Sequence, residues 1–364
     1  MSGSVDSLLT LAPGGQVGAG ARVLRLAASP SRPWKSRAVA IRAAVWLAWA
    51  MGVVWPAVLS EWSLKGVAFM SRRALLPLIA VVTIALTAGV PSAGAADLWT
   101  ETGRSLTSVN YWQGITFDAA TGTFTFDGPA QGLWRTDAQL ARLAGRSAGI
   151  PSTVMGSEGW NHLGDLSFDA AGGPRLLVPL ECYYPTASDP NTCHTGGFGV
   201  VDPVTLQWRY YVKLDPAQIT KAMWVEVSPD SRWVWTSSGT DLLAYDATQI
   251  SPQRAGPAGT PLTAAKRIVG VLRAPGVSGA AFLGDRLYLA FDRGSYVQVL
   301  SYPVDPTTGD VGTAWRLEIQ RTKTSSLYET EGLAVAAALG GTLHWQIQPQ
   351  IPFYARIVHF VPAS

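Results

Sequence analysis

Five side chains are of the types that hold cations or move protons in proteins: His162, Asp165, Glu181, His194 and Glu331. Imidazole nitrogens and carboxylate oxygens are ligands for divalent ions. A histidine next to a carboxylate can also act as a general base that the carboxylate orients. We treat His162, Asp165 and Glu331 as candidate catalytic residues, and Asp165, Glu181 and Glu331 as candidate metal ligands. Their spacing matches no zinc signature, so the alternative, in which His162 and Asp165 tie loop backbone together, stays open.

A second set of residues could bind a ligand by contact. Its members are Gln113, Trp160, Asn161, Glu181, Tyr183, Tyr184 and His194. Exposed aromatic side chains on a loop face can stack on a sugar ring or on a peptide. The alternative for Trp160, and for Trp112, is that they pack inside the fold.

The chain has two cysteines, Cys182 and Cys193, which flank a loop of ten residues. In an oxidising compartment a local pair of this kind usually forms a disulfide, and we expect one here. Such a bridge would carry His194 over the loop face near His162. The alternative is a pair of buried free thiols.

One pattern recurs along the chain and must position these residues. It is clearest over residues 160–181: a polar entry, an apolar–polar alternation ending in Asp, a turn with Gly, and a second apolar run. Short alternating runs bounded by Gly, Pro, Asp and Asn predict strands and turns. The copies span residues 113–128, 162–181, 223–237, 277–292 and 331–348. Their starts lie roughly 50 to 60 residues apart, a spacing that indicates four-stranded propeller blades.

The predicted fold class is therefore an all-β propeller of five or six four-stranded blades over residues 97–364. A sixth blade could be built from residues 98–110 and 356–362. Residues 355–360 also suit a pairing of N- and C-terminal strands that would close the ring. The alternative fold is an irregular β-sandwich, which does not require one unit at near-constant spacing.

Two local features complete the expected elements. Candidate third strands end in Asp followed by Pro or Ala, at Asp202, Asp246 and Asp305, and these residue types favour tight turns. One short helix is expected over residues 137–143, with Asp137 as its N-cap.

Three stretches together resemble a known group of proteins: residues 113–115, residues 162–165 with 177–181, and residues 329–333. They are similar to the secreted and periplasmic propellers of the senescence-marker/gluconolactonase and strictosidine-synthase-like kind. The resemblance covers most of residues 97–364 and lies in the blade pattern. It implies a divalent metal, usually calcium, bound at the channel mouth by Glu, Asn and Asp, and hydrolysis of lactones or esters. The chain keeps Glu331 before a blade strand but lacks clear Asn ligands in its later blades.

The first 96 residues differ in composition from the rest. They carry nine Lys or Arg and two acids, whereas the remainder carries 19 basic and 23 acidic residues. Residues 70–73 are basic, 74–90 are apolar and 93–95 are small, which predicts a signal peptide over 70–96. The alternative is an uncleaved membrane helix, for which the run is short. Residues 1–69 either contain a transmembrane helix at 43–59 or precede a true start at Met70, and we favour the misplaced start.

These features limit the classes of function that the chain can have. The part after residue 96 has no Lys/Arg cluster for nucleic acid, and no membrane attachment is expected after signal cleavage. We find no phosphate loop, Rossmann fingerprint, H-E-x-x-H motif or nucleophile elbow. We predict a secreted propeller that binds a small molecule, glycan or peptide through the loop face around its channel. The alternative is a metal-assisted hydrolase of lactones, esters or phosphoesters at the channel mouth, with calcium as the ion that the resemblance implies.

Overall fold

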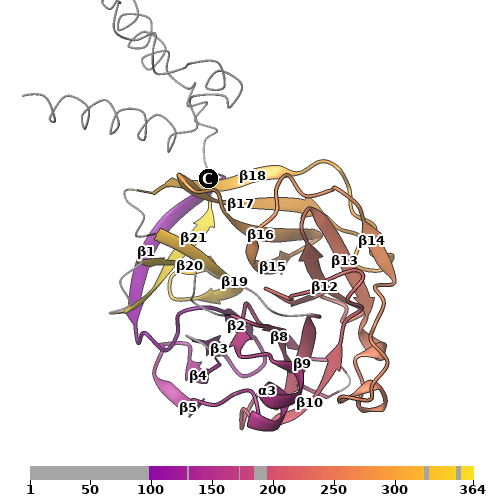
Figure 1. Cartoon of the computed structure of the whole chain (residues 1–364). Coiled ribbons are helices and arrows are strands. Elements are labelled where there is room, and N and C mark those ends of the chain that lie inside the picture. Colours follow the sequence, from indigo (N-terminus) through magenta and orange to yellow (C-terminus); the bar gives the residue numbers. More distant parts are fainter. Residues whose placement is uncertain (1–97, 129–130, 172, 184–194, 324–327, 350–353) are drawn as a thin grey trace, which may run out of the picture. The chain divides into compact units, whose positions relative to one another are not determined.

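Five antiparallel sheets are arranged as blades around a common centre (Figure 1). The structure, a computed structural model, describes residues 98–128, 131–171, 173–183, 195–323, 328–349 and 354–364. The predicted all-β propeller is therefore confirmed, with five blades rather than six. The predicted signal peptide and the segment 1–69 lie outside the described residues.

Four of the blades follow one another along the chain. Blade 1 consists of β2 (Ile115–Asp118), β3 (Thr123–Asp127), β4 (Leu133–Asp137) and β5 (Arg142–Arg146). Blade 2 consists of β6 (His162–Leu163), β7 (Ser167–Asp169), β8 (Arg175–Glu181), β9 (Gly197–Val201) and β10 (Trp208–Lys213). Blade 3 consists of β11 (Glu226–Val227), β12 (Trp233–Ser238), β13 (Asp241–Asp246) and β14 (Lys266–Ile268). Blade 4 consists of β15 (Val277–Leu283), β16 (Arg286–Asp292), β17 (Tyr296–Pro303) and β18 (Arg316–Thr322).

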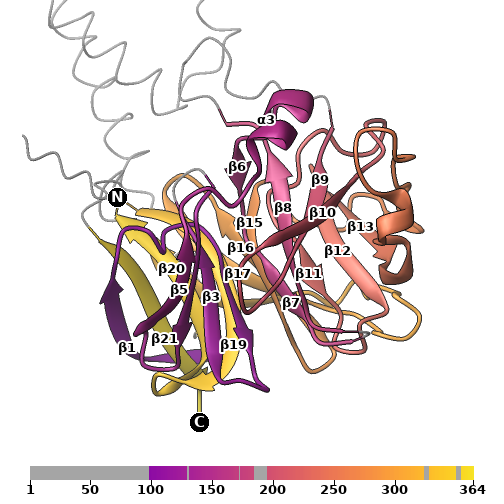
Figure 2. The same ribbon diagram turned by 90° about the horizontal axis from the view of Figure 1, so that it is seen from below.

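The fifth blade closes the ring by joining the two ends of the propeller. It consists of β19 (Tyr328–Ala338), β20 (Gly341–Pro349), β21 (Ala355–Pro362) and β1 (Trp99–Thr107). Strands β1 and β21 pair antiparallel and lie side by side in both ribbon views (Figures 1 and 2). The predicted sixth blade from residues 98–110 and 356–362 is therefore wrong, because these segments complete the blade of residues 331–348. The predicted closure by terminal strands is confirmed.

Each blade buries its apolar faces against its two neighbours. The buried side chains fall into five clusters, one at each blade interface. Trp235 and Trp345 are fully buried in two of these clusters. A single blade would leave both faces in water, so closing the ring is what buries them.

An aspartate ends or closely follows the third strand of blades 2, 3 and 4, as predicted: Asp202 follows β9, Asp246 ends β13, and Asp305 lies two residues after β17. The side chain of Asp202 accepts hydrogen bonds from the backbone N–H groups of Val204 and Thr205, and Asp246 and Asp305 cap their turns in the same way. Asp137 ends β4 and accepts from the N–H groups of Gln139 and Ala141.

The helix predicted over residues 137–143 is wrong, because Leu140 has a φ of 66° in this turn and β5 follows it. The described helical elements lie elsewhere and are short. They are α3 (Ser152–Glu158), η3 (Ala247–Gln249) and η4 (Pro252–Arg254). In the described part of the chain, no helix is long and apolar enough to cross a membrane.

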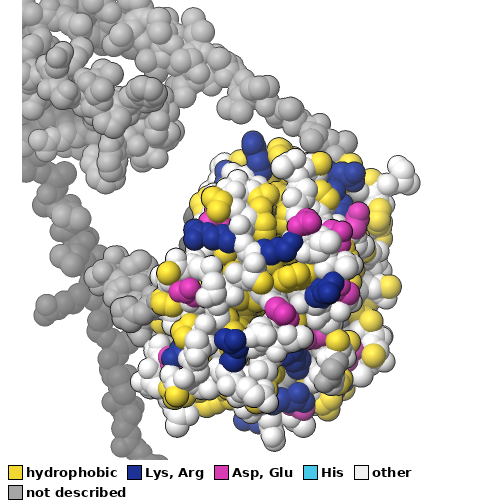
Figure 3. Space-filling model, turned by 90° about the vertical axis from the view of Figure 1, so that its right-hand side faces the viewer, with side chains coloured by type: hydrophobic (Ala, Val, Ile, Leu, Met, Phe, Trp, Pro, Cys, Tyr) yellow, Lys and Arg dark blue, Asp and Glu magenta, His cyan; other side chains and the backbone are white. Residues whose placement is uncertain are grey.

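The outer surface shown in Figure 3 carries basic and acidic side chains interspersed. The surface ion pair Lys266–Asp310, at 2.6 Å, joins two neighbouring chain segments. Exposed pairs of this kind contribute little to stability, so the fold depends on the blade interfaces.

Candidate functional site at the channel mouth

Asp165 joins blades 1, 2, 4 and 5 at the centre of the ring through its carboxylate. Its Oδ1 accepts a hydrogen bond from the Ile115 N–H at 3.0 Å. Its Oδ2 accepts from the N–H groups of Ala280 at 2.8 Å and Leu333 at 3.2 Å. Burial raises the pKa of Asp165, and the three donors oppose that rise. Three backbone donors already engage this carboxylate, an arrangement that matches the structural role left open in the sequence.

The backbone of Asp165 joins blade 3. Asp165 lies in the gap between β6 and β7, where its N–H donates to the Met223 carbonyl at 3.1 Å and its carbonyl accepts from the Val225 N–H at 2.9 Å. Gly164 permits this close approach, because an added Cβ would lie 1.9 Å from the Met223 oxygen. The Gly-Asp pair seen in the sequence thus connects all five blades.

A further tier of hydrogen bonds lies beyond Asp165 along the inner strands. In each of these contacts, a side chain of one blade accepts a hydrogen bond from a backbone N–H of the next blade. The pairs of acceptor and donor are Thr116 and Phe168, Ser167 and Val227, and Glu226 and Phe282. Burial raises the pKa of Glu226 to about 8, although these polar contacts oppose it. Glu226 lies on the opposite side of Asp165 from Glu331.

On the other side of Asp165 lies the set of residues that we call the channel mouth. It comprises Gln113, Asp127, His162, Glu181, Lys221 and Glu331, which come from the ends of the first and second strands of blades 1, 2 and 5 and from the segment before β11. The structure thus brings four of the predicted residues, Gln113, His162, Glu181 and Glu331, to the same end of the channel. Asp127 and Lys221 were not predicted.

His162 and Glu181 form a hydrogen-bonded pair across β6 and β8. The Nδ1 of His162 lies 2.7 Å from the Oε1 of Glu181, and the Lys221 Nζ lies 3.1 Å from the Oε2. The Lys221 contact is an ion pair without a hydrogen bond of good geometry at Oε2. Burial alone would raise the pKa of Glu181, but His162 and Lys221 outweigh it and the pKa is lowered. Glu181 is thus ionised at neutral pH.

Asp127 and Glu331 are also buried carboxyl groups, but their pKa values are raised, whereas that of Glu181 is lowered. Both oxygens of Asp127 are buried, and neither accepts a hydrogen bond of good geometry from the described residues. The nearby N–H groups of Gly114 and Asp127 itself only partly stabilise its charge. Burial is the largest cause that raises the pKa of Asp127, and repulsion from Asp165 is the second. Burial is likewise the largest cause that raises the pKa of Glu331, and repulsion from Glu329 is the second. Among the described residues these two groups have no cationic partner of the kind that Glu181 has, and a positive charge beside them would stabilise their ionised forms.

Asp127 occupies a position that recurs between blades. It ends the second strand of blade 1, as Glu181 ends that of blade 2 and Asp292 that of blade 4. Aligning the sequence copies by the end of their second run would have revealed this series of acids. Gly114 makes room for Asp127, because an added Cβ would lie 2.4 Å from its Oδ1.

Tyr183 lies exposed beside the mouth, with its ring 5.1 Å from that of His162. Asn161 fixes the Tyr183 backbone by accepting from its N–H at 2.7 Å and donating to its carbonyl at 2.9 Å. Tyr183 and Asn161, two predicted ligand-binding residues, therefore lie side by side. Gln113, a third, has a buried amide oxygen that accepts no hydrogen bond from the described residues.

Trp160 does not reach the mouth. It is fully buried between blades 1 and 2, and its Nε1 donates to the Thr195 carbonyl at 2.9 Å. Trp112 is likewise buried between blades 5 and 1. Both placements match the alternative of packing inside the fold, so the ring-stacking role predicted for Trp160 is corrected.

Several predicted residues cannot be placed. Tyr184, Cys193 and His194 lie outside the described residues, so the bridge between Cys182 and Cys193 stays a prediction. Among the described residues, no three His, Cys, Asp or Glu side chains lie close enough together to hold one metal ion. Asp165, Glu181 and Glu331 as metal ligands therefore stay a prediction as well.

Known proteins resemble this chain only distantly. No family model matches the chain, and no curated protein sequence matches it. Among solved structures, Myxococcus xanthus glutaminyl cyclase is similar at 12% identity and a TM-score of 0.40, over 72% of this chain and 95% of the other. The PQQ-bound aldose sugar dehydrogenase of Streptomyces coelicolor is similar at 11% identity and a TM-score of 0.38, over 72% and 97%. The apo-form soluble aldose sugar dehydrogenase of Escherichia coli is similar at 10% identity and a TM-score of 0.40, over 72% and 99%. By its own five sheets the chain is a five-bladed β-propeller, and the specific resemblance to gluconolactonase-type propellers stays a prediction.

Proposed function

We propose that this chain is an exported β-propeller that binds a small, positively charged ligand at the channel mouth. The observation that supports it is the state of Asp127 and Glu331, two buried carboxyl groups that face repulsion from neighbouring acids. Glu181 Oε2 has its ion pair with Lys221, and the other buried side-chain atoms of the mouth without a hydrogen bond among the described residues are acceptors, on Gln113 and Asp127. A ligand that supplies hydrogen-bond donors and positive charge complements such a surface.

An organic ammonium group suits this surface better than a bare metal ion. A metal needs three or more ligands at about 2.0–2.6 Å, and the described residues offer no such group. An ammonium ion carries its own N–H donors and can contact acids that stand farther apart. The exposed ring of Tyr183, which Asn161 holds in place, could then contact the cation through its face.

Neutralising the two carboxyl groups tests the proposal. We expect Asp127→Asn and Glu331→Gln each to weaken binding of butylammonium at least about tenfold, or ~1.4 kcal/mol, by isothermal titration calorimetry. Affinity in the unmodified protein should rise with pH, because protons compete for carboxyl groups whose pKa is raised. Calcium chloride, titrated in parallel, decides between an organic cation and a divalent metal.

The matched control is Glu226→Gln, which removes a buried carboxyl on the opposite side of Asp165 and keeps an acceptor for the Phe282 N–H. It should leave binding unchanged. The mouth variants should not lose stability at pH 7. A carboxyl group whose pKa is higher in the folded than in the unfolded protein destabilises the fold once the pH rises above the unfolded pKa, so replacing it by an amide removes that cost. Unchanged affinity in both mouth variants would contradict the proposal.

The second candidate function is hydrolysis of a lactone or ester with His162 as general base. The observation that favours it is the His162–Glu181 contact, in which the carboxylate can orient the imidazole through Nδ1 and leave Nε2 for a proton. Hydrolysis of γ-butyrolactone or phenyl acetate that disappears in His162→Gln but survives in Glu226→Gln would support it. No turnover above the buffer rate with either compound would remove it.

A further inference from the structure

A groove lies on the outer side of the propeller, where blades 5 and 1 meet, and it has a volume of about 470 Å³. Blade 5 contributes the end of β1 and residues that follow it, among them Tyr111. Blade 1 contributes the turn between β4 and β5 and the first residue of β5, Arg142. Strands β1 and β5 are the outermost strands of their blades (Figure 1). No residue of the channel mouth lines the groove, so a ligand bound there would occupy a separate site.

Arg142 is the only charged residue among the described residues that line the groove. Its guanidinium group forms no ion pair with a described carboxylate. Asp137 lies in the same turn, but its carboxylate accepts hydrogen bonds from the backbone N–H groups of Gln139 and Ala141, at 2.9 and 2.8 Å. Gly145 leaves room for the arginine, because an added Cβ would lie 2.4 Å from the Arg142 Nη2. The groove therefore offers a cation that has no counter-charge in the described part of the chain.

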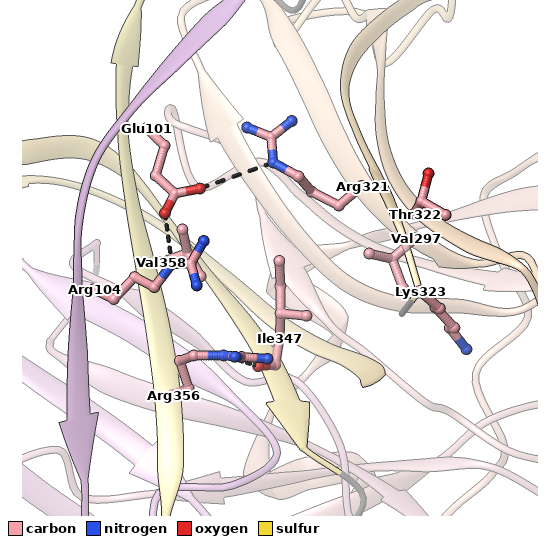
Figure 4. Close-up of a pocket in the computed structure, with 9 residues that line it drawn as sticks. All are labelled: Glu101, Arg104, Val297, Arg321, Thr322, Lys323, Ile347, Arg356 and Val358. Carbon is pink, nitrogen blue, oxygen red and sulfur yellow. Dashed lines mark hydrogen bonds and ion pairs between the residues drawn. The ribbon is translucent and has the colours of Figure 1, made fainter. Parts of the chain in front are cut away.

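The cavity between blades 4 and 5 differs from the groove, because its arginines already have partners. Three arginines line this cavity (Figure 4). One oxygen of Glu101 lies 2.6 Å from the Arg104 Nε, and the other lies 3.9 Å from the Arg321 Nε. The Nε of Arg356 donates to the Ile347 carbonyl at 2.8 Å. These contacts make the cavity a poorer candidate than the groove for binding an anion.

Groups that can both donate and accept hydrogen bonds line the groove beside Arg142. Tyr111 is 5% exposed, and its hydroxyl has no hydrogen bond to the described residues. The Tyr111 ring stacks on Phe126 with 4.7 Å between the ring centroids, which fixes the position of the hydroxyl. Burial raises the pKa of Tyr111 and Arg142 opposes that rise, so the hydroxyl is protonated at neutral pH. Ser108 accepts from the Asn110 N–H at 3.3 Å and keeps its own proton for another acceptor.

Two leucines border these polar groups. Leu106 is 65% exposed. Leu140 lies in the turn between β4 and β5 with a φ of 66°, a conformation that is uncommon for leucine. It packs against the buried cluster between blades 5 and 1, which holds its side chain at the groove. The groove thus combines one cation, several hydrogen-bonding groups and a hydrocarbon edge.

We propose that the groove binds a small monoanion that carries hydroxyl groups, such as a sugar acid. The planar guanidinium group of Arg142 matches a carboxylate in two-point geometry, and a single cation suits a single negative charge. The hydroxyls of Tyr111 and Ser108 and the amide of Gln139 can donate to and accept from the hydroxyl groups of the ligand. The leucines would contact its C–H surface. The volume falls within the ~300–1,000 Å³ of small-molecule sites, which admits a monosaccharide.

Calorimetric titration with glucuronate tests the proposal, with glucose, cyclohexanecarboxylate and inorganic phosphate as matched probes. Glucuronate should bind. Glucose lacks the charge, cyclohexanecarboxylate lacks the hydroxyl groups, and phosphate lacks the ring that would cover the leucines. Each of these three should bind at least about tenfold more weakly than glucuronate. No binding of glucuronate, or equally tight binding of any of the three probes, would overturn the proposal.

Two variants assign the binding to the groove. Arg142→Gln should weaken glucuronate binding at least about tenfold. Tyr111→Phe, which keeps the ring that stacks on Phe126, should weaken it about fivefold. The matched control is Arg146→Gln, which removes an exposed arginine of the same strand that does not line the groove, and it should leave the affinity unchanged. Full affinity in either groove variant, or an equal loss in Arg146→Gln, would contradict binding at this site.

Discussion

Replacing Asp165 by Ala should lower the free energy of unfolding by about 4 kcal/mol. The change leaves the buried N–H groups of Ile115, Ala280 and Leu333 without their acceptor. Each buried, unsatisfied donor costs about 1–3 kcal/mol, and removing a buried carboxyl returns part of that sum. Because the three donors belong to different blades, the loss should appear as one cooperative shift of the whole propeller. Urea denaturation followed by tryptophan fluorescence and by circular dichroism measures it.

Two further variants isolate the cause. Asp165→Asn keeps one acceptor oxygen and turns an amide N–H toward a backbone donor, so we expect about half the loss. Asp202→Ala removes a carboxylate that also accepts two backbone N–H groups but lies at an outer turn where water can replace it. It should cost about 1 kcal/mol or less. If Asp165→Ala were no more costly than Asp202→Ala, Asp165 would not hold the blades together.

The sequence predicted what depends on local pattern. Strand–turn–strand units, their spacing and the aspartates that end third strands all follow from alternation and turn chemistry within a few residues. The error at residues 137–143 was also local: a possible helix cap at Asp137 proved to be a turn that leads into β5, which pairs with β4. Here tertiary pairing outweighed a weak helix signal.

What the sequence could not predict depends on distant partners. The donors to the Asp165 carboxylate lie 50, 115 and 168 positions away, so the type and spacing of this residue could not show that its oxygens were already engaged. The choice between five and six blades stayed open for the same reason: β1 pairs with β21, a strand at the opposite end of the propeller, and repetition alone does not say which ends meet. At the channel mouth, Asp127 was missed because its significance comes from the acids that surround it in space.

The closing blade contains a buried histidine pair that neither composition nor repetition indicated. His344 of β20 and His359 of β21 lie opposite each other in register, with their Nδ1 atoms 2.9 Å apart. The His344 Nε2 lies 2.9 Å from the Ala336 carbonyl of β19, and the His359 Nε2 lies 2.8 Å from the Ser105 hydroxyl of β1. One chain of hydrogen bonds therefore crosses all four strands of the blade that closes the ring.

The direction of these hydrogen bonds fixes both histidines in the neutral state. The Ala336 carbonyl can only accept, so the His344 Nε2 carries a proton and its Nδ1 accepts. His359 must then donate from Nδ1 and accept from the Ser105 hydroxyl at Nε2. A further proton on the His344 Nδ1 would face the His359 Nδ1–H, and a further proton on either ring would bury a charge.

Acid should therefore weaken the closure of the ring. Burial lowers the pKa of His344 to about 4 and lowers that of His359 as well, whereas an unfolded histidine has a pKa of about 6.5. Between these values the unfolded chain binds more protons, so the stabilisation is complete above pH ~6.5 and is lost as pH falls toward 4. His344 alone accounts for a loss of about 3 kcal/mol, and His359 adds to it in the same direction.

The difference between the protein and a variant without this pair gives the cleanest measurement, because the buried acids of the channel have the opposite pH dependence. We expect the stability of the unmodified protein, minus that of His344→Gln/His359→Gln, to fall by about 3 kcal/mol or more between pH 7.5 and 4. NMR titration of the imidazole protons in the unmodified protein provides a second measurement, in which His344 should stay neutral to about pH 4. Parallel stability curves, or a His344 that titrates near pH 6.5, would show that closing the blade does not depend on keeping this pair uncharged.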